Sequence, residues 1–134
     1  MFLSKSDSFR KLRILIADDD RVISIGLQLA LEELGHEVVG WAATGEGAIE
    51  LASQQRPNVV FMDISLEEDL SGIDAAMVIR EDLSIPSVFF SGSSDERTRR
   101  DAAAAEPLAF VDKLITQEEL ARLLRRLTES GQLG

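Results

Sequence analysis

ILIADDD, residues 14–20, is a short hydrophobic run that stops at three acidic residues. Three further runs also stop at polar side chains, namely VVFMD (59–63), VFFSG (88–92) and FVDK (110–113). Each run is rich in β-branched or aromatic residues, as buried strands are. The carboxyl ends of parallel strands meet at one edge of a sheet, where binding sites form. The sequence therefore predicts that three carboxylates, a hydroxyl and an ammonium converge at that edge.

Strand-like and helix-like segments alternate along the chain. Hydrophobic periodicity predicts strands over about 12–17, 37–42, 58–63, 86–91 and 108–112, and helices over about 21–34, 45–55, 72–82, 94–105 and 116–129. This alternation favours an α/β fold with a doubly wound, five-stranded parallel sheet that helices cover on both faces. The periodicity does not fix the order of the strands.

Local signals mark several helix ends. Gly35 is placed to end the first helix, whose apolar face is expected to include Val22, Ile25, Leu29 and Leu34. Two hydroxyl residues precede a Glu by three positions, which is the spacing of a capping box: Ser93 with Glu96, and Thr116 with Glu119.

Length and composition limit the classes of function. The 134 residues fit one domain, predicted over 12–130 after a flexible segment at 1–11, and from the short tail beyond the last helix no output domain is expected within this sequence. A net charge of -10 disfavours direct binding to nucleic acid or to an anionic membrane, and the lack of Cys excludes thiolate chemistry. No signal peptide or apolar run of about 20 residues is seen, so a cytoplasmic protein is expected.

The acidic residues at two strand ends predict a metal site. Mg²⁺ prefers oxygen ligands and usually keeps several waters, and Asp18 and Asp19 together with Asp63 would suit it. Asp63 can serve either as a ligand or as a nucleophile towards phosphorus. The alternative is that the acidic triplet only caps a helix, a role assigned first to Asp20.

Other polar residues have weaker signals. Lys113 can form a plain ion pair or bind a phosphoryl oxygen, and Ser91 can donate to the same group or be a turn residue. His36, the single histidine, falls in a predicted turn and is expected to be exposed to solvent. Trp41 is expected to serve in packing.

Taken together, these motifs resemble a response-regulator receiver domain of two-component signalling, similar to the chemotaxis regulator. The resemblance covers residues 12–128 and is carried by ILIADDD (14–20), GHEVVGWAATGEGAIELA (35–52), VVFMDIS (59–65), SGID (71–74), VFFSG (88–92) and FVDK (110–113). It implies a (βα)5, flavodoxin-like sheet of strand order 2-1-3-4-5.

The resemblance also implies a role for each site residue. Asp63 would accept a phosphoryl group from a sensor histidine kinase or a histidine phosphotransfer protein. The Mg²⁺ ligands would be Asp18, Asp19, Asp63 and the main-chain carbonyl of Ser65. Lys113 and Ser91 would bind the phosphoryl group, Phe110 would be the aromatic switch residue, and the fourth helix, fifth strand and fifth helix would bind an unknown downstream protein. A monomer or weak dimer is expected.

Two departures from the family pattern stand out. Leu114 replaces the usual Pro after the Lys. A non-proline cis bond costs about 2.5–4 kcal/mol, so a trans Lys113–Leu114 bond is predicted. A trans bond is expected to reshape the loop between the fifth strand and the fifth helix and to displace Lys113. The loop over 65–71 is longer, lacks the usual Pro, and carries Glu67, Glu68 and Asp69.

These departures leave other functions open. The main alternative is a degenerate receiver that acts as an interaction module without phosphorylation. A flavodoxin-like binder of a small molecule is a further alternative, although the acidic residues 18–20 would repel a flavin phosphate.

Overall fold

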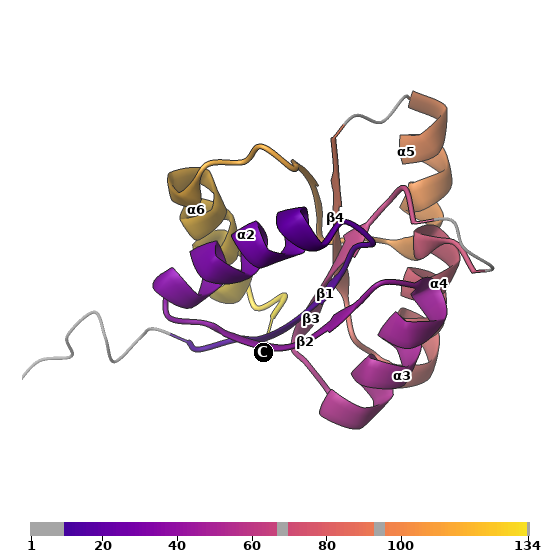
Figure 1. The fold of residues 1–134 in the computed structure, drawn as a ribbon, viewed down its shortest axis with the longest axis horizontal. Coiled ribbons are helices and arrows are strands. Elements are labelled where there is room, and N and C mark those ends of the chain that lie inside the picture. The colour runs from indigo at the N-terminus through magenta and orange to yellow at the C-terminus, as the bar shows by residue number, and fades with distance from the viewer. Residues whose placement is uncertain (1–9, 67–69, 93–95, 134) are drawn as a thin grey trace, which may run out of the picture.

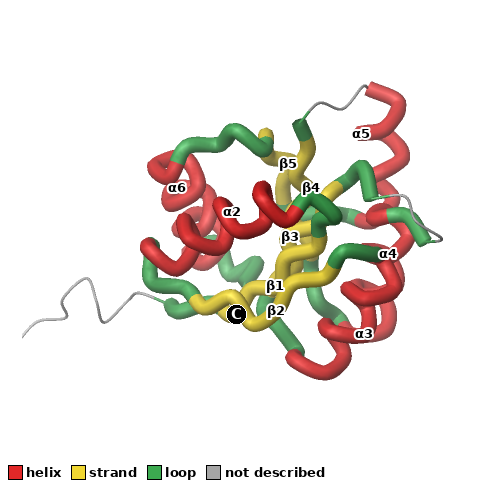
Figure 2. The backbone as a smooth tube through the Cα atoms, viewed as in Figure 1, coloured by secondary structure: helices red, strands yellow, loops and turns green. Residues whose placement is uncertain are grey.

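A computed structural model describes residues 10–66, 70–92 and 96–133. Strands and helices alternate along it, as Figures 1 and 2 show. The strands are β1 (Arg13–Ala17), β2 (Glu37–Ala42), β3 (Val59–Asp63), β4 (Ser87–Ser91) and β5 (Ala109–Asp112). The helices are α2 (Arg21–Glu33), α3 (Gly45–Gln55), α4 (Gly72–Leu83), α5 (Glu96–Ala102), the 3₁₀ helix η1 (Ala103–Ala105) and α6 (Gln117–Glu129).

The five strands form one parallel sheet of order β2-β1-β3-β4-β5. Helices α2 and α6 cover one face, and α3, α4 and α5 cover the other (Figures 1 and 2). The predicted α/β class and strand order are therefore confirmed. β3 lies at the centre, and all five of its residues are buried, Asp63 included.

Most predicted helix ends agree with the structure. Asp20 caps α2 by accepting hydrogen bonds from the backbone N–H groups of Val22 and Ile23, and Gly35 follows the helix with a φ of 97°. The capping box of Thr116 and Glu119 is present at the start of α6. The capping box expected of Ser93 lies outside the described residues.

The fourth predicted helix is shorter than expected. The sequence predicted a helix over 94–105, whereas α5 ends at Ala102 and the chain continues as the 3₁₀ turn η1. Glu106 then adopts a positive φ of 49°, and Pro107 follows it. Proline disfavours the helical conformation in the residue before it, which accounts for the end of the helical turns at Ala105, and a final 3₁₀ turn is common at helix ends.

The apolar face of α2 was predicted wrongly for three of its four residues. Only Leu34 packs against the core, whereas Val22, Ile25 and Leu29 are 79%, 43% and 59% exposed. The inward face is formed instead by Ile23, Leu27, Ala30 and Leu31. Both stripes are apolar at helical spacing, so periodicity alone cannot choose between them. The exposed stripe leaves a hydrophobic strip on the surface.

His36 was also predicted wrongly, because its side chain is buried and not exposed. It is 8% exposed, and its Nδ1 accepts a hydrogen bond of 3.0 Å from the backbone N–H of Leu12. A protonated Nδ1 could not accept that bond. Burial lowers the pKa of His36 below its ordinary value.

We expect His36 to make stability depend on pH. Its folded-state pKa is lowered, so its contribution is complete above about pH 6.5, the ordinary pKa, and is lost as pH falls through the folded-state value. In that window the free energy of unfolding of the parent should fall by up to about 1.4 kcal/mol per pH unit more than that of His36→Gln. Urea unfolding of both proteins between about pH 5 and 8 measures this difference. Parallel curves would contradict the prediction.

Candidate functional site

The site lies where the central strands end at the carboxyl edge of the sheet. Asp18 follows β1, Asp63 is the last residue of β3, and Lys113 follows β5. β1 and β3 are paired neighbours with Ala17 opposite Met62, so the next residues on each strand, Asp18 and Asp63, emerge side by side. The parallel topology thus brings together residues that are 45 to 95 positions apart in the sequence.

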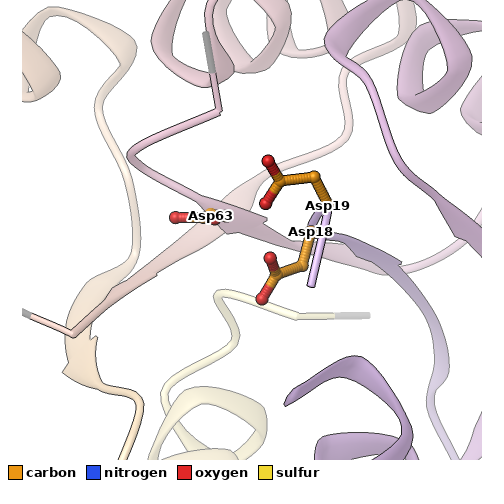
Figure 3. Close-up of side chains that lie close together, drawn as sticks. All are labelled: Asp18, Asp19 and Asp63. Atoms are coloured by element: carbon orange, nitrogen blue, oxygen red, sulfur yellow. The ribbon is translucent and has the colours of Figure 1, made fainter. Parts of the chain in front are cut away.

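Three carboxylates gather at this edge, as Figure 3 shows. One oxygen from each of Asp18, Asp19 and Asp63 lies within 4.8 Å of the others. Asp18 and Asp63 are buried, at 0% and 2% exposure, whereas Asp19 is exposed. Two buried like charges at this separation are unfavourable unless a cation lies near them.

Lys113 provides such a cation. Its Nζ lies 3.2 Å from Oδ2 of Asp63 and 3.3 Å from Oδ2 of Asp18. Burial of the ammonium favours its neutral form, but the carboxylates of Asp63 and Asp18 outweigh this effect and raise the pKa of Lys113 above its ordinary value. Lys113 therefore remains charged and bridges the two buried carboxylates.

Leu114 does not displace Lys113. The described chain has no cis peptide bond, so the trans bond predicted before Leu114 is confirmed. The backbone N–H of Leu114 donates to Oδ1 of Asp112 at 2.7 Å, a bond that a proline at this position could not make. The turn after β5 is therefore closed by a side-chain hydrogen bond, with Lys113 directed at the carboxylates.

Asp18 is held through its main chain and its side chain. Its N–H donates to the carbonyl of Ala42 at 2.9 Å, and its own carbonyl accepts from Nε1 of Trp41 at 2.9 Å. Oδ1 accepts from the N–H of Asp20, whereas the buried Oδ2 accepts no hydrogen bond from the described residues. Burial, with a further contribution from Asp63, raises the pKa of Asp18 above its ordinary value.

The contact of Trp41 with this loop was not foreseen from the sequence, which predicted only packing. Alternation along β2 indicates the face on which Trp41 lies, but hydrophobic periodicity cannot predict a hydrogen bond from an indole to a main-chain carbonyl. The only signal for this contact in the sequence was a single Trp on the strand expected after the acidic loop at 18–20.

The chain around Asp63 is held equally closely. Oδ1 of Asp63 accepts a 2.9 Å hydrogen bond from the backbone N–H of Ser65. At the start of α4, a Cβ on Gly72 would collide with the carbonyl oxygen of Asp63, so only glycine fits there. The metal-ligand role expected of the Ser65 carbonyl stays a prediction. Glu67, Glu68 and Asp69 of the loop over 65–71 lie outside the described residues.

Ser91 and Phe110 lie on the other side of Asp63. Ser91 ends β4, and its carbonyl accepts a 3.0 Å hydrogen bond from the N–H of Lys113. Phe110 is half-buried on β5, its ring centroid 5.9 Å from that of Phe89, with the guanidinium of Arg99 5.5 Å above it. These residues line a cavity of about 50 Å³. The structure therefore places Ser91 beside the main chain of Lys113 and Phe110 at the cavity that Ser91 also lines, and their switching roles stay predictions.

The donor set fits a hard divalent cation. Carboxylate oxygens are preferred Mg²⁺ ligands, and the buried Oδ2 of Asp18 has the ion pair with Lys113 but accepts no hydrogen bond from the described residues. A cation would also relieve the repulsion between Asp18, Asp19 and Asp63.

Among the described residues, no helix is long and apolar enough to cross a membrane.

Comparison with known proteins gives consistent results. The model of the response regulator receiver domain family matches residues 14–125. Among curated relatives, the transcriptional regulatory protein PdtaR of Mycobacterium tuberculosis is 34% identical over 108 residues, covering 81% of this chain and 52% of PdtaR. The transcriptional regulatory protein KdpE of the same species is 34% identical over 124 residues, covering 90% of this chain and 54% of KdpE. The chain thus spans about half the length of these relatives.

Solved structures share the fold. The signal receiver domain of a modulated diguanylate cyclase from Desulfovibrio desulfuricans G20 superposes with a TM-score of 0.85 at 27% identity, covering 92% of this chain and 98% of that one. The match of the family model to most of the chain, together with the acidic edge and its lysine, leads to one conclusion. The chain belongs to the response regulator receiver domains of two-component signalling.

Proposed function

We propose that this receiver domain is a phosphorylation switch in which Asp63 accepts a phosphoryl group. The donor is a phosphohistidine on a sensor histidine kinase or on a histidine phosphotransfer protein, and the transfer depends on Mg²⁺. The observation that carries the proposal is the position of Lys113, whose ammonium contacts one oxygen of each buried carboxylate, Asp63 and Asp18. The arrangement supports a switch over a degenerate module, because the substitution at Leu114 leaves Lys113 in place.

The chemistry requires a nucleophile and positive charge. An oxygen of Asp63 forms a bond to phosphorus while the bond from phosphorus to the donor imidazole nitrogen breaks, and that nitrogen keeps the electron pair. The product is an acyl phosphate on Asp63. The 3.2 Å contact of the Lys113 ammonium with Asp63 supports a role in stabilising the charge on the phosphoryl oxygens. Ser91 donates to the same group.

The cation site supports this transfer. Asp18, Asp19 and Asp63, with the carbonyl of Ser65, are the proposed ligands, and a bound Mg²⁺ supplies further positive charge for the incoming phosphoryl oxygens. The domain catalyses only its own phosphorylation and dephosphorylation, and in this sense is a switch and not an enzyme acting on other substrates. Ser91 and Phe110 then rearrange, and the surface of α5, β5 and α6 binds a downstream protein.

The donor protein has an apolar surface available beside the site. Four large hydrophobic side chains are exposed among the described residues, and three of them, Val22, Ile25 and Leu29, form one stripe on α2. The fourth, Leu114, is 85% exposed, and its neighbours Lys113 and Ile115 line a 210 Å³ cavity together with Val22. Exposed carboxylates border this surface, at Asp19, Asp20 and Asp112. We infer that the phosphodonor protein binds this surface with an apolar patch that is bordered by basic residues.

One prediction concerns the phosphoacceptor. Incubation with Mg²⁺ and acetyl phosphate should add one phosphoryl group to the parent protein and none to Asp63→Asn, as measured by intact mass. Asp20→Asn is the matched control, because it removes one charge from the same edge and keeps a good N-cap; it should label like the parent. Chelation of Mg²⁺ should abolish labelling. Normal labelling of Asp63→Asn would overturn the assignment of Asp63.

Another prediction concerns the donor surface. The double variant Val22→Gln and Leu114→Gln should accept a phosphoryl group from acetyl phosphate at the parental rate. Among the described residues, the buried carboxylates are held by Lys113 and by main-chain N–H groups, and not by these two side chains. Its transfer rate from a histidine kinase that phosphorylates the parent should fall about tenfold, as expected for the loss of buried apolar anchors at an interface. Radiolabel transfer from the phosphorylated kinase measures the rate. An unchanged rate would show that the donor binds elsewhere.

A further inference from the structure

The peptide group that joins Asp18 to Asp19 is held by a side chain from another strand. Its carbonyl accepts a 2.9 Å hydrogen bond from Nε1 of Trp41 on β2. Its N–H belongs to Asp19, so the orientation of this one planar group determines how both acidic residues leave the main chain. The preceding N–H, that of Asp18, is fixed by the carbonyl of Ala42, also on β2.

The indole of Trp41 is itself held in place. Trp41 is half-buried, packs against the core on the α2 and α6 face, and lies opposite Ile16 in the sheet. The guanidinium of Arg21, the first residue of α2, lies 4.4 Å from the centroid of the Trp41 ring, which is a cation–π distance. Nη1 of Arg21 donates to Oγ of Ser24, which keeps the guanidinium over the ring. The indole N–H is therefore a rigid donor.

We propose that Trp41 is a positioning residue for the divalent cation site, because its indole N–H fixes the peptide that carries Asp18 and Asp19. Mg²⁺ demands nearly ideal octahedral geometry, so its affinity depends on carboxylates that are oriented before the ion arrives. Groups that orient metal ligands typically contribute 10- to 100-fold to affinity. The inference rests on the cation site of the proposed function and adds a residue to it.

A purely structural Trp41 would behave differently. If the ring served only to fill space, removal of its N–H would lower stability and leave Mg²⁺ affinity unchanged. The decisive variant is therefore Trp41→Phe, which keeps an aromatic ring for Arg21 and removes the donor to the Asp18 carbonyl. The matched control is Val38→Ala, which truncates a side chain of the same strand and the same core cluster at a position paired with Ile14 and distant from the acidic loop.

The test is isothermal titration of each folded protein with MgCl₂, with the unfolding free energy measured in parallel. Trp41→Phe should bind Mg²⁺ about tenfold more weakly than the parent, a change equivalent to about 1.4 kcal/mol. Val38→Ala should lose stability and keep the parental affinity. Parental affinity in Trp41→Phe, or an equal loss in Val38→Ala, would overturn the role of Trp41 and leave the cation site standing. A parent that binds no Mg²⁺ would overturn the cation site as well.

A second variant keeps the proposal testable if Trp41→Phe folds poorly. Arg21→Lys preserves the positive charge near the site and loses the planar guanidinium that stacks on the indole. It should weaken Mg²⁺ binding a few-fold, by releasing the indole. Unchanged or tighter binding in a folded Arg21→Lys protein would contradict the proposal.

Discussion

The burial of two carboxylates side by side, Asp18 and Asp63, is the constraint on which the rest of this structure depends. Neither is more than 2% exposed, and two like charges in such a place would oppose folding. Lys113 offsets this repulsion from the end of β5 by contacting one oxygen of each. The compensation is incomplete, because one ammonium faces two buried carboxylates, and Oδ2 of Asp18 has this ion pair but accepts no hydrogen bond from the described residues. The site is thus built to take up further positive charge, which is the property that a magnesium-dependent phosphoryl acceptor needs.

The order of the strands is what makes this constraint possible. With β3 at the centre, Asp63 has β1 on one side and β4 on the other, and β5 lies one strand further away. The short side chain of Asp18 reaches Asp63 from the adjacent strand, whereas the more distant β5 contributes a long lysine. Helix α4 closes over the end of β3 through Gly72, where any side chain would meet the main chain of Asp63. Each residue type therefore follows from the distance it must span.

Much of the fold and of the site was predictable from the sequence, because runs of β-branched and aromatic residues predict the strands, and the carboxyl ends of parallel strands share one edge of the sheet. The convergence of Asp18, Asp63 and Lys113 followed from that rule alone. Strand order did not follow from periodicity and came from resemblance to the family. The predicted inward face of α2 was wrong because the helix carries two apolar stripes, and the sequence pattern does not show which of them packs against the sheet. The prediction for His36 was wrong for a related reason: a turn residue is usually exposed, but this one accepts a hydrogen bond from Leu12, the residue before β1.

The two sides of the site are built differently, and this difference bears on how a switch would work. On the β1 and β2 side, the acidic loop is held by main-chain bonds to Ala42 and Trp41 and by the Asp20 cap. On the β4 and β5 side, Ser91 and Phe110 border a small cavity, and Phe110 is covered by an arginine from the short helix α5. A ring beside a cavity can move at less cost than a hydrogen-bonded loop within a packed core. In the proposed switch, a phosphoryl group on Asp63 would act between a fixed cation side and a movable partner side, so that the signal would travel towards α5, β5 and α6 while the carboxylates of the proposed cation site keep their arrangement.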